Sequence, residues 1–71
     1  MRELLAKRVQ TLRVQKRWSQ MNLAKAAGVP QSTISDIESA KRIPRGDSLS
    51  KIALSLGTTT SYLLGEIEKA S

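Results

Sequence analysis

The chain has 71 residues, no cysteine, no histidine, and twelve Lys and Arg against six Asp and Glu, a formal net charge of +6. A chain of this size buries only about 60% of the surface that it exposes when open, which is enough for one small core and one domain. Without His and Cys it lacks the commonest zinc ligands, thiol nucleophiles and disulfides, and the usual general base near neutral pH, so we expect no enzyme activity, no metal and no cofactor.

The first predicted element is a helix over about residues 2–16. Leu5, Val9 and Leu12 fall at positions i, i+4 and i+7, which places them on one side of a helix. This apolar stripe predicts that one side of the helix is buried in the core.

The second predicted helix starts after Ser19, whose hydroxyl can accept a hydrogen bond from an amide of the first turn. It carries Leu23, Ala24 and Ala27 on one side. Gly28 ends it, because glycine adopts at little cost the left-handed conformation that commonly follows a helix.

Pro30 begins the third predicted helix, over about residues 31–39, because its fixed φ suits a helix start and it has no amide to leave unpaired. Ile34 and Ile37 face inward on this helix. A basic loop over residues 40–46 follows.

The fourth predicted helix ends at Gly57, and a short fifth helix follows a threonine cap. The apolar residues of these two helices are Leu49, Ile52, Ala53 and Leu56, and then Tyr62, Leu63 and Leu64 after Thr58–Thr60. Aromatic residues are sparse and β-branched residues do not alternate, so no strand is predicted. We therefore predict an all-α fold of five short helices, one domain over residues 1–65, followed by a polar tail, residues 66–71, that frays.

The positive charge is concentrated in the first part of the chain. Residues 1–45 hold ten basic and three acidic residues, a net charge of +7, whereas residues 46–71 hold two basic and three acidic residues, a net charge of −1. A basic binding face requires such a segregation, although a charged surface that only keeps the protein soluble is the simpler explanation.

The junction between the second and third helices is the most specific feature of the sequence. A helix-turn-helix needs small residues where two helices cross closely, glycine in the tight turn, and apolar residues that fix the angle of the second helix. These needs are met by Ala24, Ala27, Gly28, Val29, Ile34 and Ile37.

With this junction, the sequence resembles the lambda repressor and Cro type of helix-turn-helix domain, found in phage repressors, in regulators of the xenobiotic-response-element family and in many small bacterial regulators. The resemblance covers about residues 3–65. It rests on Trp18-Ser19-Gln20, Leu23–Val29, Ser32–Glu38, Lys41–Pro44, Leu49–Gly57 and Tyr62–Gly65. The resemblance implies a five-helix domain that binds double-stranded DNA and whose third helix enters the major groove.

The sequence departs from the family pattern at three positions. Pro30 stands where the family often has a Ser or Thr cap, Ala40 where it often has glycine, and Asn22 where it usually has glutamate. The first two departures concern how the third helix starts and ends. The third removes a negative charge from a surface that would approach DNA.

The third helix would present short polar side chains to base edges. Steps of 100° place Ser32, Ser35, Asp36 and Ser39 opposite its buried side. Gln31 projects from the N-terminal tip, where a recognition helix first meets base edges, and its carboxamide can pair bidentately with adenine N6 and N7. The serines discriminate less. Asp36 could accept from cytosine N4 or simply offset nearby positive charge, and Gln31 could be no more than an exposed first-turn residue.

Phosphate contacts are implied by the resemblance. In the family, the residue that matches Gln20 lies at the N-terminus of the second helix and contacts a backbone phosphate, where free amides and the helix dipole favour an anion. The family's loop after the recognition helix also lies against phosphate, which assigns Lys41, Arg42 and Arg45 to this role. The weaker candidates are Lys16, Arg17 and Lys25. All of these side chains could instead be ordinary solvated groups.

Two features are interpreted as structural. Arg13 flanks the apolar stripe of the first helix and Glu38 flanks that of the third, and the family positions that they match form an ion pair between the two helices. Trp18 joins two helices away from the recognition face, so we expect it to pack in the protein rather than to stack on bases.

The leading hypothesis is a sequence-specific, DNA-binding transcriptional regulator, a repressor that binds a palindromic operator as a homodimer. One monomer would read about four or five base pairs, so useful specificity calls for two recognition helices about 34 Å apart. Tyr62, Leu63 and Leu64 could form the dimer face; alternatively, the two leucines complete the core and leave the tyrosine alone at the surface. No small-molecule substrate is expected, and the predicted location is the cytoplasm, at a bacterial nucleoid or in a phage-infected host.

Two other hypotheses remain. An antitoxin or adaptor module would have another protein as its main partner, and an exposed apolar patch beyond one dimer face would indicate it. Binding to a membrane surface through the basic first helix is disfavoured, because the apolar stripe of that helix is needed in the core. In addition, no run approaches the roughly 18 apolar residues of a membrane span, and the charges at Lys7 and Arg8 are unlike a signal peptide.

Overall fold

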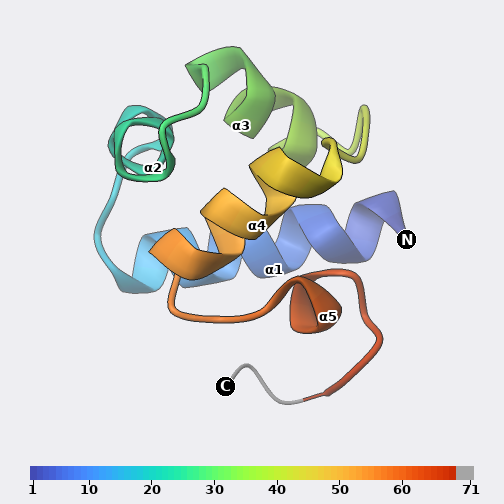
Figure 1. Cartoon of the computed structure of the whole chain (residues 1–71). Helices are drawn as coiled ribbons and strands as arrows, with labels where there is room; N and C mark the ends of the chain where they lie inside the picture. The colour runs from blue at the N-terminus through green and yellow to red at the C-terminus, as the bar shows by residue number, and fades with distance from the viewer. Residues whose placement is uncertain (69–71) are drawn as a thin grey trace.

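The computed structural model describes residues 1–68, and this part of the chain forms five helices and no strand. Figure 1 shows them in chain order: α1 (Arg2–Gln15), α2 (Gln20–Ala27), α3 (Gln31–Glu38), α4 (Gly46–Ser55) and α5 (Thr60–Leu63). The predicted all-α fold is confirmed, and the predicted ends of the first and third helices each extend one residue too far. None of the helices in the described range is long and apolar enough to cross a membrane.

The start of α2 explains one departure from the family pattern. The Ser19 hydroxyl accepts from the Asn22 amide at 3.0 Å, and the Asn22 side chain accepts from the Ser19 amide at 2.9 Å. Asn22 therefore closes a capping box, the role that glutamate or glutamine usually has at this position. At the other end of α2, Gly28 has a φ of +70°, the left-handed conformation predicted for it.

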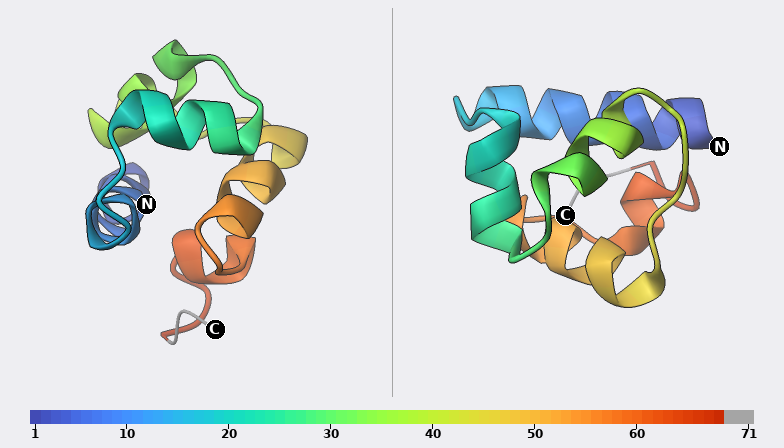
Figure 2. Two further views of the ribbon diagram at one scale, coloured as in Figure 1. Left: turned by 90° about the vertical axis from the view of Figure 1, so that its left-hand side faces the viewer. Right: turned by 90° about the horizontal axis from the view of Figure 1, so that it is seen from above.

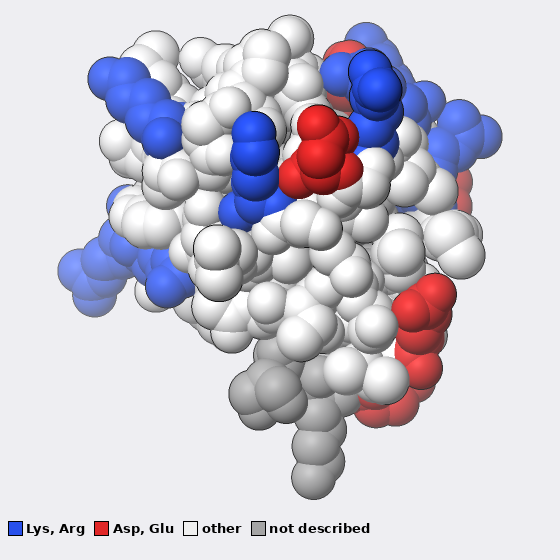
Figure 3. Space-filling view, viewed as in Figure 1, with Lys and Arg blue, Asp and Glu red and all other residues white. Residues whose placement is uncertain are grey.

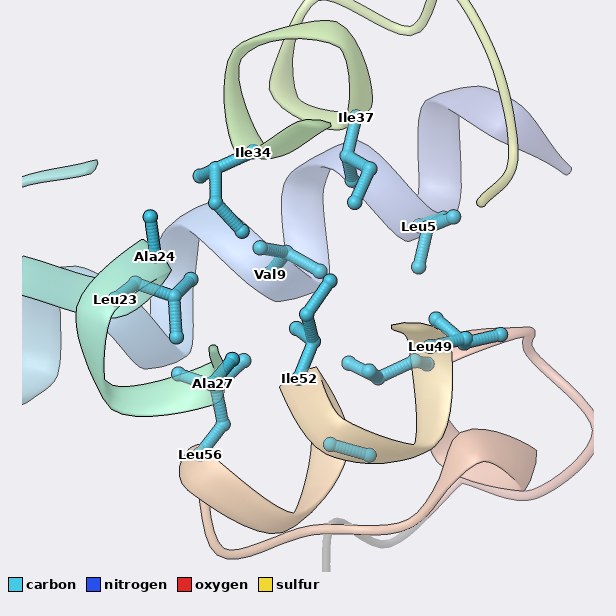
Figure 4. Close-up of a cluster of buried hydrophobic side chains, with 12 residues drawn as sticks. Leu5, Val9, Leu23, Ala24, Ala27, Ile34, Ile37, Leu49, Ile52 and Leu56 are labelled. Atoms are coloured by element: carbon cyan, nitrogen blue, oxygen red, sulfur yellow. The ribbon is translucent and has the colours of Figure 1, made fainter. Parts of the chain in front are cut away.

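One apolar core joins all five helices. The cluster of buried residues comprises Leu5, Val9, Leu23, Ala24, Ala27, Ile34, Ile37, Leu49, Ile52, Ala53, Leu56 and Leu63. Figure 4 shows the isoleucines of α3 pointing toward side chains from α1, α2 and α4. Because burying an Ile or Leu side chain contributes about 1.5–3 kcal/mol, these contacts fix α3 firmly on its inner side.

The helices place α3 and α5 at opposite ends of the molecule. α2 packs against α3 and α4, and α1 packs against both α3 and α5. The left view in Figure 2 agrees with Figure 1: α2 and α3 lie together at one end, α1 and α4 in the middle, and α5 at the other end. The outer side of α3 is therefore left uncovered by the other helices.

The segment after α5 is attached to α1 by Arg8. Its guanidinium donates to the carbonyl oxygens of Tyr62 and Ile67, lies 3.3 Å from the Glu68 carboxylate, and sits 4.0 Å above the centre of the Tyr62 ring. Arg8 thus holds residues 66–68 near α1, within the stretch expected to fray. The remainder of that predicted tail, residues 69–71, lies outside the described residues.

The short α5 contributes mainly to the core. Thr59 caps it by accepting from the Tyr62 amide at 3.1 Å. Leu63 is fully buried, whereas Tyr62 and Leu64 are partly buried and pack against the core. Leu63 therefore adds no surface to a dimer face, and of the three residues predicted for that face only Tyr62 and Leu64 have exposed area.

Candidate nucleic-acid interface

The exposed side of α3 carries the residues predicted to read base edges. Ile34 and Ile37 are fully buried, and Gln31, Ser32 and Ser35 are exposed. Asp36 is partly buried, with 35% of its side chain exposed. The helix therefore has one side fixed in the core and one polar side open to a ligand, the division that a recognition helix requires.

Pro30 starts α3 without a side-chain cap, as predicted. Its ψ of 146° is extended, and its carbonyl oxygen accepts from the Thr33 amide at 3.0 Å. The helix therefore forms without the Ser or Thr cap, and a backbone carbonyl takes the place of a capping side chain for the Thr33 amide.

The end of α3 is shaped by Ala40, which has a φ of +59°. The Ala40 amide donates to the Ile37 carbonyl oxygen at 3.0 Å, and the Lys41 amide donates to the Asp36 carbonyl oxygen at 2.9 Å. This is the Schellman pattern, which normally has glycine at the left-handed position. Alanine keeps the turn that the family glycine would make, at the cost of strain, and this turn directs the basic loop back along α3.

Glu38 lies at the centre of a buried polar network. Its carboxylate accepts from Arg13 Nε at 2.7 Å and from Arg13 Nη2 at 2.9 Å, a bidentate pair. Only 5% of the Glu38 side chain and 13% of the Arg13 side chain are exposed. Arg13 Nη1 also donates to the Trp18 carbonyl oxygen at 2.7 Å. The expected ion pair between the first and third helices is present, and it also holds the turn that leads into α2.

The network raises the pKa of Arg13 above its ordinary value, chiefly through the hydrogen bonds to Glu38. A raised pKa in the folded state means that the ionisation of Arg13 contributes fully to stability below the pKa of the unfolded arginine. That contribution is lost only as the pH rises through the folded pKa. The charge of Arg13 therefore does not titrate in the neutral range.

Gln20 takes part in this network, a contact that the sequence did not predict. Its Nε2 donates to Glu38 Oε1 at 3.2 Å. The carboxamide predicted to contact phosphate is thus engaged with α3 and is only partly exposed. One of its two N–H donors and its carbonyl oxygen remain for another partner, so Gln20 joins α1, α2 and α3 at the carboxylate of Glu38.

Asp36 and Arg42, predicted as a base reader and a phosphate ligand, are brought together. Arg42 Nε lies 3.3 Å from Asp36 Oδ2, and Arg42 Nη2 donates to Thr33 Oγ1 at 3.3 Å. Thr33 is buried, whereas 53% of the Arg42 side chain is exposed. Asp36 therefore lies beside a positive charge that it can offset, as the simpler of its two interpretations requires.

The other predicted cations are exposed, and they lie in the sequence just before α2, within α2 and just after α3. Lys41 and Arg45 belong to the segment between α3 and α4, and the Lys41 carbonyl oxygen accepts from Arg2 Nη1 at 3.1 Å. Lys16, Arg17 and Lys25 are also exposed. Lys16 Nζ lies 5.3 Å from the centre of the Trp18 ring, which itself packs against the core.

The distribution of charge on the surface follows these positions. Figure 3 shows basic side chains over α2, over the turn that follows α1 and around the loop that follows α3. On the same face, acidic side chains lie beside basic ones over α4 and at the upper right, and a separate acidic area without basic side chains lies at the lower right, toward the segment that follows α5. The end of the molecule that contains α2 and α3 is therefore the one suited to a polyanion.

Two residues that contribute to the site were not predicted from the sequence. Thr33 supplies the hydroxyl that holds Arg42, and Arg2 fixes the backbone of the basic loop. The spacing of Thr33 and Asp36, i and i+3 on a helix, puts both on one flank and could have indicated a shared partner. No comparable signal exists for Arg2, because its contact depends on how the loop returns past α1.

Comparison with known proteins agrees with this geometry. A profile of the helix-turn-helix family matches residues 9–63. A crystal structure of a hypothetical transcription factor, NHTF, from Neisseria is 32% identical, with a TM-score of 0.82 over 89% of this chain and 72% of that chain. A structure of the SinR protein in complex with the SinI protein is 32% identical, with a TM-score of 0.81 over 87% of this chain and 61% of that chain. A search of curated proteins found no match.

Proposed function

The chain belongs to the helix-turn-helix family of DNA-binding transcription regulators, and on this premise we propose that it binds a palindromic operator as a homodimer and represses transcription. In this proposal α3 lies in the major groove, Gln31, Ser32 and Ser35 read base edges, and basic residues around α2 and α3 contact phosphates. It has no catalytic role and acts in the cytoplasm.

The observation that carries this proposal is the contrast between the two sides of α3. The inner side is fixed by two fully buried isoleucines and by the Glu38 network, whereas the outer side carries exposed Gln31, Ser32 and Ser35. Reading bases needs side chains held at a fixed angle, because a bidentate contact tolerates little displacement. Short polar residues let the helix backbone approach the base edges closely.

Phosphate binding is assigned to residues that flank this helix. Lys41 and Arg45 are exposed on the segment that follows α3, and Lys25 is exposed in the last turn of α2. Contacts to phosphate position a protein on the duplex without reading its sequence. We therefore assign affinity mainly to these cations and sequence preference mainly to α3.

The dimer follows from the size of the reading surface. One recognition helix of eight residues contacts too few base pairs to define a unique site, whereas two copies spaced about 34 Å apart read a palindrome. Tyr62 and Leu64 supply the exposed part of the proposed interface. Sedimentation at high protein concentration, with and without operator, tests this: only monomer under both conditions would contradict the dimer.

Selection of bound sequences from random duplexes, followed by affinity measurements against salt, tests the whole proposal. We expect an enriched palindromic motif. With a slope of about −0.9 per phosphate contact, a dimer with six to ten contacts should lose about 10³–10⁵ in affinity between about 50 and 200 mM salt. Recovery of no motif would contradict sequence-specific regulation.

A protein partner is the second candidate, in an antitoxin or adaptor role. The SinR neighbour was solved in complex with another protein, SinI. In addition, Leu54 on α4 is 80% exposed, an apolar side chain that the core does not use. If Leu54→Ser abolishes association between protein chains in the absence of DNA without changing the unfolding temperature, this surface has a role in protein contacts; unchanged association argues against it.

A further inference from the structure

Arg42 is held on the flank of the recognition helix by a hydrogen bond and an ion pair. Nη2 donates to Thr33 Oγ1, and Nε lies within ion-pair distance of Asp36 Oδ2, both at 3.3 Å. Thr33 is 6% exposed and lies three residues before Asp36, so both acceptors are on the same flank of α3. A loop arginine is thereby attached to the helix that carries the predicted base readers.

The contacts occupy one particular edge of the guanidinium. A guanidinium has five N–H donors in a rigid plane, and Nε with one N–H of Nη2 forms one edge of that plane. That edge faces α3. The edge formed by Nη1 and the second N–H of Nη2 is not used by these contacts, and 53% of the side chain is exposed.

We propose that Asp36 and Thr33 act as positioning residues for Arg42, which presents its second edge to a pair of acceptors on the DNA. The inference rests on the proposed function. Guanine O6 and N7 in the major groove, or two oxygens of one phosphate, offer the paired acceptors that such an edge binds bidentately. Asp36 accordingly influences DNA recognition through Arg42 and does not itself accept from a base.

The arrangement also accounts for a carboxylate on a surface that faces a polyanion. An unpaired Asp36 would be repelled by phosphates, whereas the Asp36–Arg42 pair carries no net charge. A neutral pair adds little general attraction to DNA, so its contribution depends on the direction of the free guanidinium edge. If Asp36 acted only through its charge, removing that charge would strengthen binding to every duplex by the same factor.

Two substitutions of Asp36 separate positioning from charge. Asp36→Asn removes the charge but keeps an oxygen that can accept from Arg42 Nε, whereas Asp36→Ala removes both. Dissociation constants for the selected operator and for an unrelated duplex are measured for both variants at one salt concentration. Because both variants lack the charge, we expect Asp36→Ala to bind the operator about tenfold more weakly than Asp36→Asn, on the operator alone if Arg42 binds guanine and on both duplexes if it binds phosphate. Equal affinities of the two variants on both duplexes would overturn the proposal.

Arg42→Lys and Arg42→Ala identify the acceptor. Lysine keeps the charge but lacks the planar fork, so both substitutions should weaken operator binding, by about fivefold or more. A loss confined to operators with guanine at one position identifies the guanine edge. A loss on all duplexes, with the salt slope of Arg42→Ala reduced by about 0.9 per site, identifies phosphate. If Arg42→Lys binds the operator as tightly as the original protein does, the planar guanidinium is not needed, and the proposal that Asp36 and Thr33 position it is contradicted.

Lys51→Ala is the matched control, because it removes one exposed positive charge from α4, outside the α2–α3 unit. A measurement without DNA completes the test: the Nε proton of Arg42 should exchange with water more slowly than that of the exposed Arg45, and Asp36→Ala should remove the difference. Equal exchange rates in the original protein would show that Arg42 is not held. Absence of binding to any duplex would instead contradict the proposed function, so the two failures are distinguishable.

Discussion

The two carboxylates of α3 are two residues apart, and each is paired with an arginine, but their surroundings differ. Glu38 has 5% of its side chain exposed and a bidentate partner in Arg13 at 2.7 and 2.9 Å. Asp36 has 35% exposed and a single contact of 3.3 Å with Arg42. Burial makes the first pair costly to break, whereas solvent weakens the second. A carboxylate–arginine pair therefore stabilises the fold on the inner flank of the helix, whereas the pair on the outer flank is available for recognition.

The largest expected effect is that of Glu38→Ala on stability. The substitution leaves Arg13 as a buried cation without its carboxylate, which costs on the order of 3–5 kcal/mol. For a domain of this size, each 1 kcal/mol lowers the unfolding temperature by about 4–8 °C. Thermal unfolding followed by circular dichroism measures the change.

Asp36→Ala is the matched control on the same helix. It also deletes a carboxylate, but an exposed pair contributes at most about 1 kcal/mol, so the unfolding temperature should fall by only a few degrees. Similar unfolding temperatures for the two variants would remove the distinction between the inner and the outer flank of α3.

Gln31→Ala has the next largest effect, and it concerns DNA rather than stability. Gln31 is exposed in the first turn of α3, so its removal should leave the unfolding temperature unchanged. Loss of a bidentate contact should remove about 1–3 kcal/mol of discrimination at one base pair of the operator. Affinities for operators substituted at each position test this. A uniform loss at every position would show that Gln31 positions the protein instead of reading a base.

Gln20→Ala tests whether Gln20 stabilises the fold or binds phosphate. Its Nε2 donates to Glu38 at 3.2 Å, and a hydrogen bond to a charged group of this kind contributes about 1–2 kcal/mol. We expect a loss of that size in the free energy of unfolding, measured with urea. If stability is unchanged and affinity for all duplexes falls, Gln20 serves phosphate binding only.

The smallest effect is a gain in stability from Ala40→Gly. Ala40 has a φ of +59°, where an L-residue other than glycine is strained by about 1–2 kcal/mol. The greater freedom of glycine in the unfolded chain offsets part of this relief, which leaves a net gain of about 0.5–1 kcal/mol. Because the turn at Ala40 directs the basic loop, operator affinity should stay the same. A loss of stability would show that Ala40 contributes through its methyl group.

The core and the helices could be predicted from the sequence because they depend on local patterns. Leu5 and Val9 recur at helical spacing, and Ser19 and Gly28 mark the two ends of α2. The exposed residues of α3 follow from the same periodicity once its apolar residues are known. The resemblance to known regulators supplied the pairing of Arg13 with Glu38, which no local pattern specifies.

The other contacts between segments could not be predicted, because they depend on angles and loop paths. Gln20, the first residue of α2, reaches Glu38, the last residue of α3, only because of the angle at which the two helices pack. Arg42 reaches Asp36 only because the turn at Ala40 directs the loop back along α3. An alanine at a positive φ is not expected from its propensity. The sequence therefore indicated which side chains of α3 lie on its exposed side but not which of them are already paired.

The central claim is that the outer side of α3 binds DNA while its inner side holds it in place. Chemical-shift changes of the backbone amides, recorded by NMR during titration with the selected operator, test this claim most directly. We predict the largest changes at Gln31, Ser32 and Ser35 and in the loop from Ala40 to Arg45, with small changes in α5. The largest changes in α4 or α5, with α3 unaffected, would contradict it.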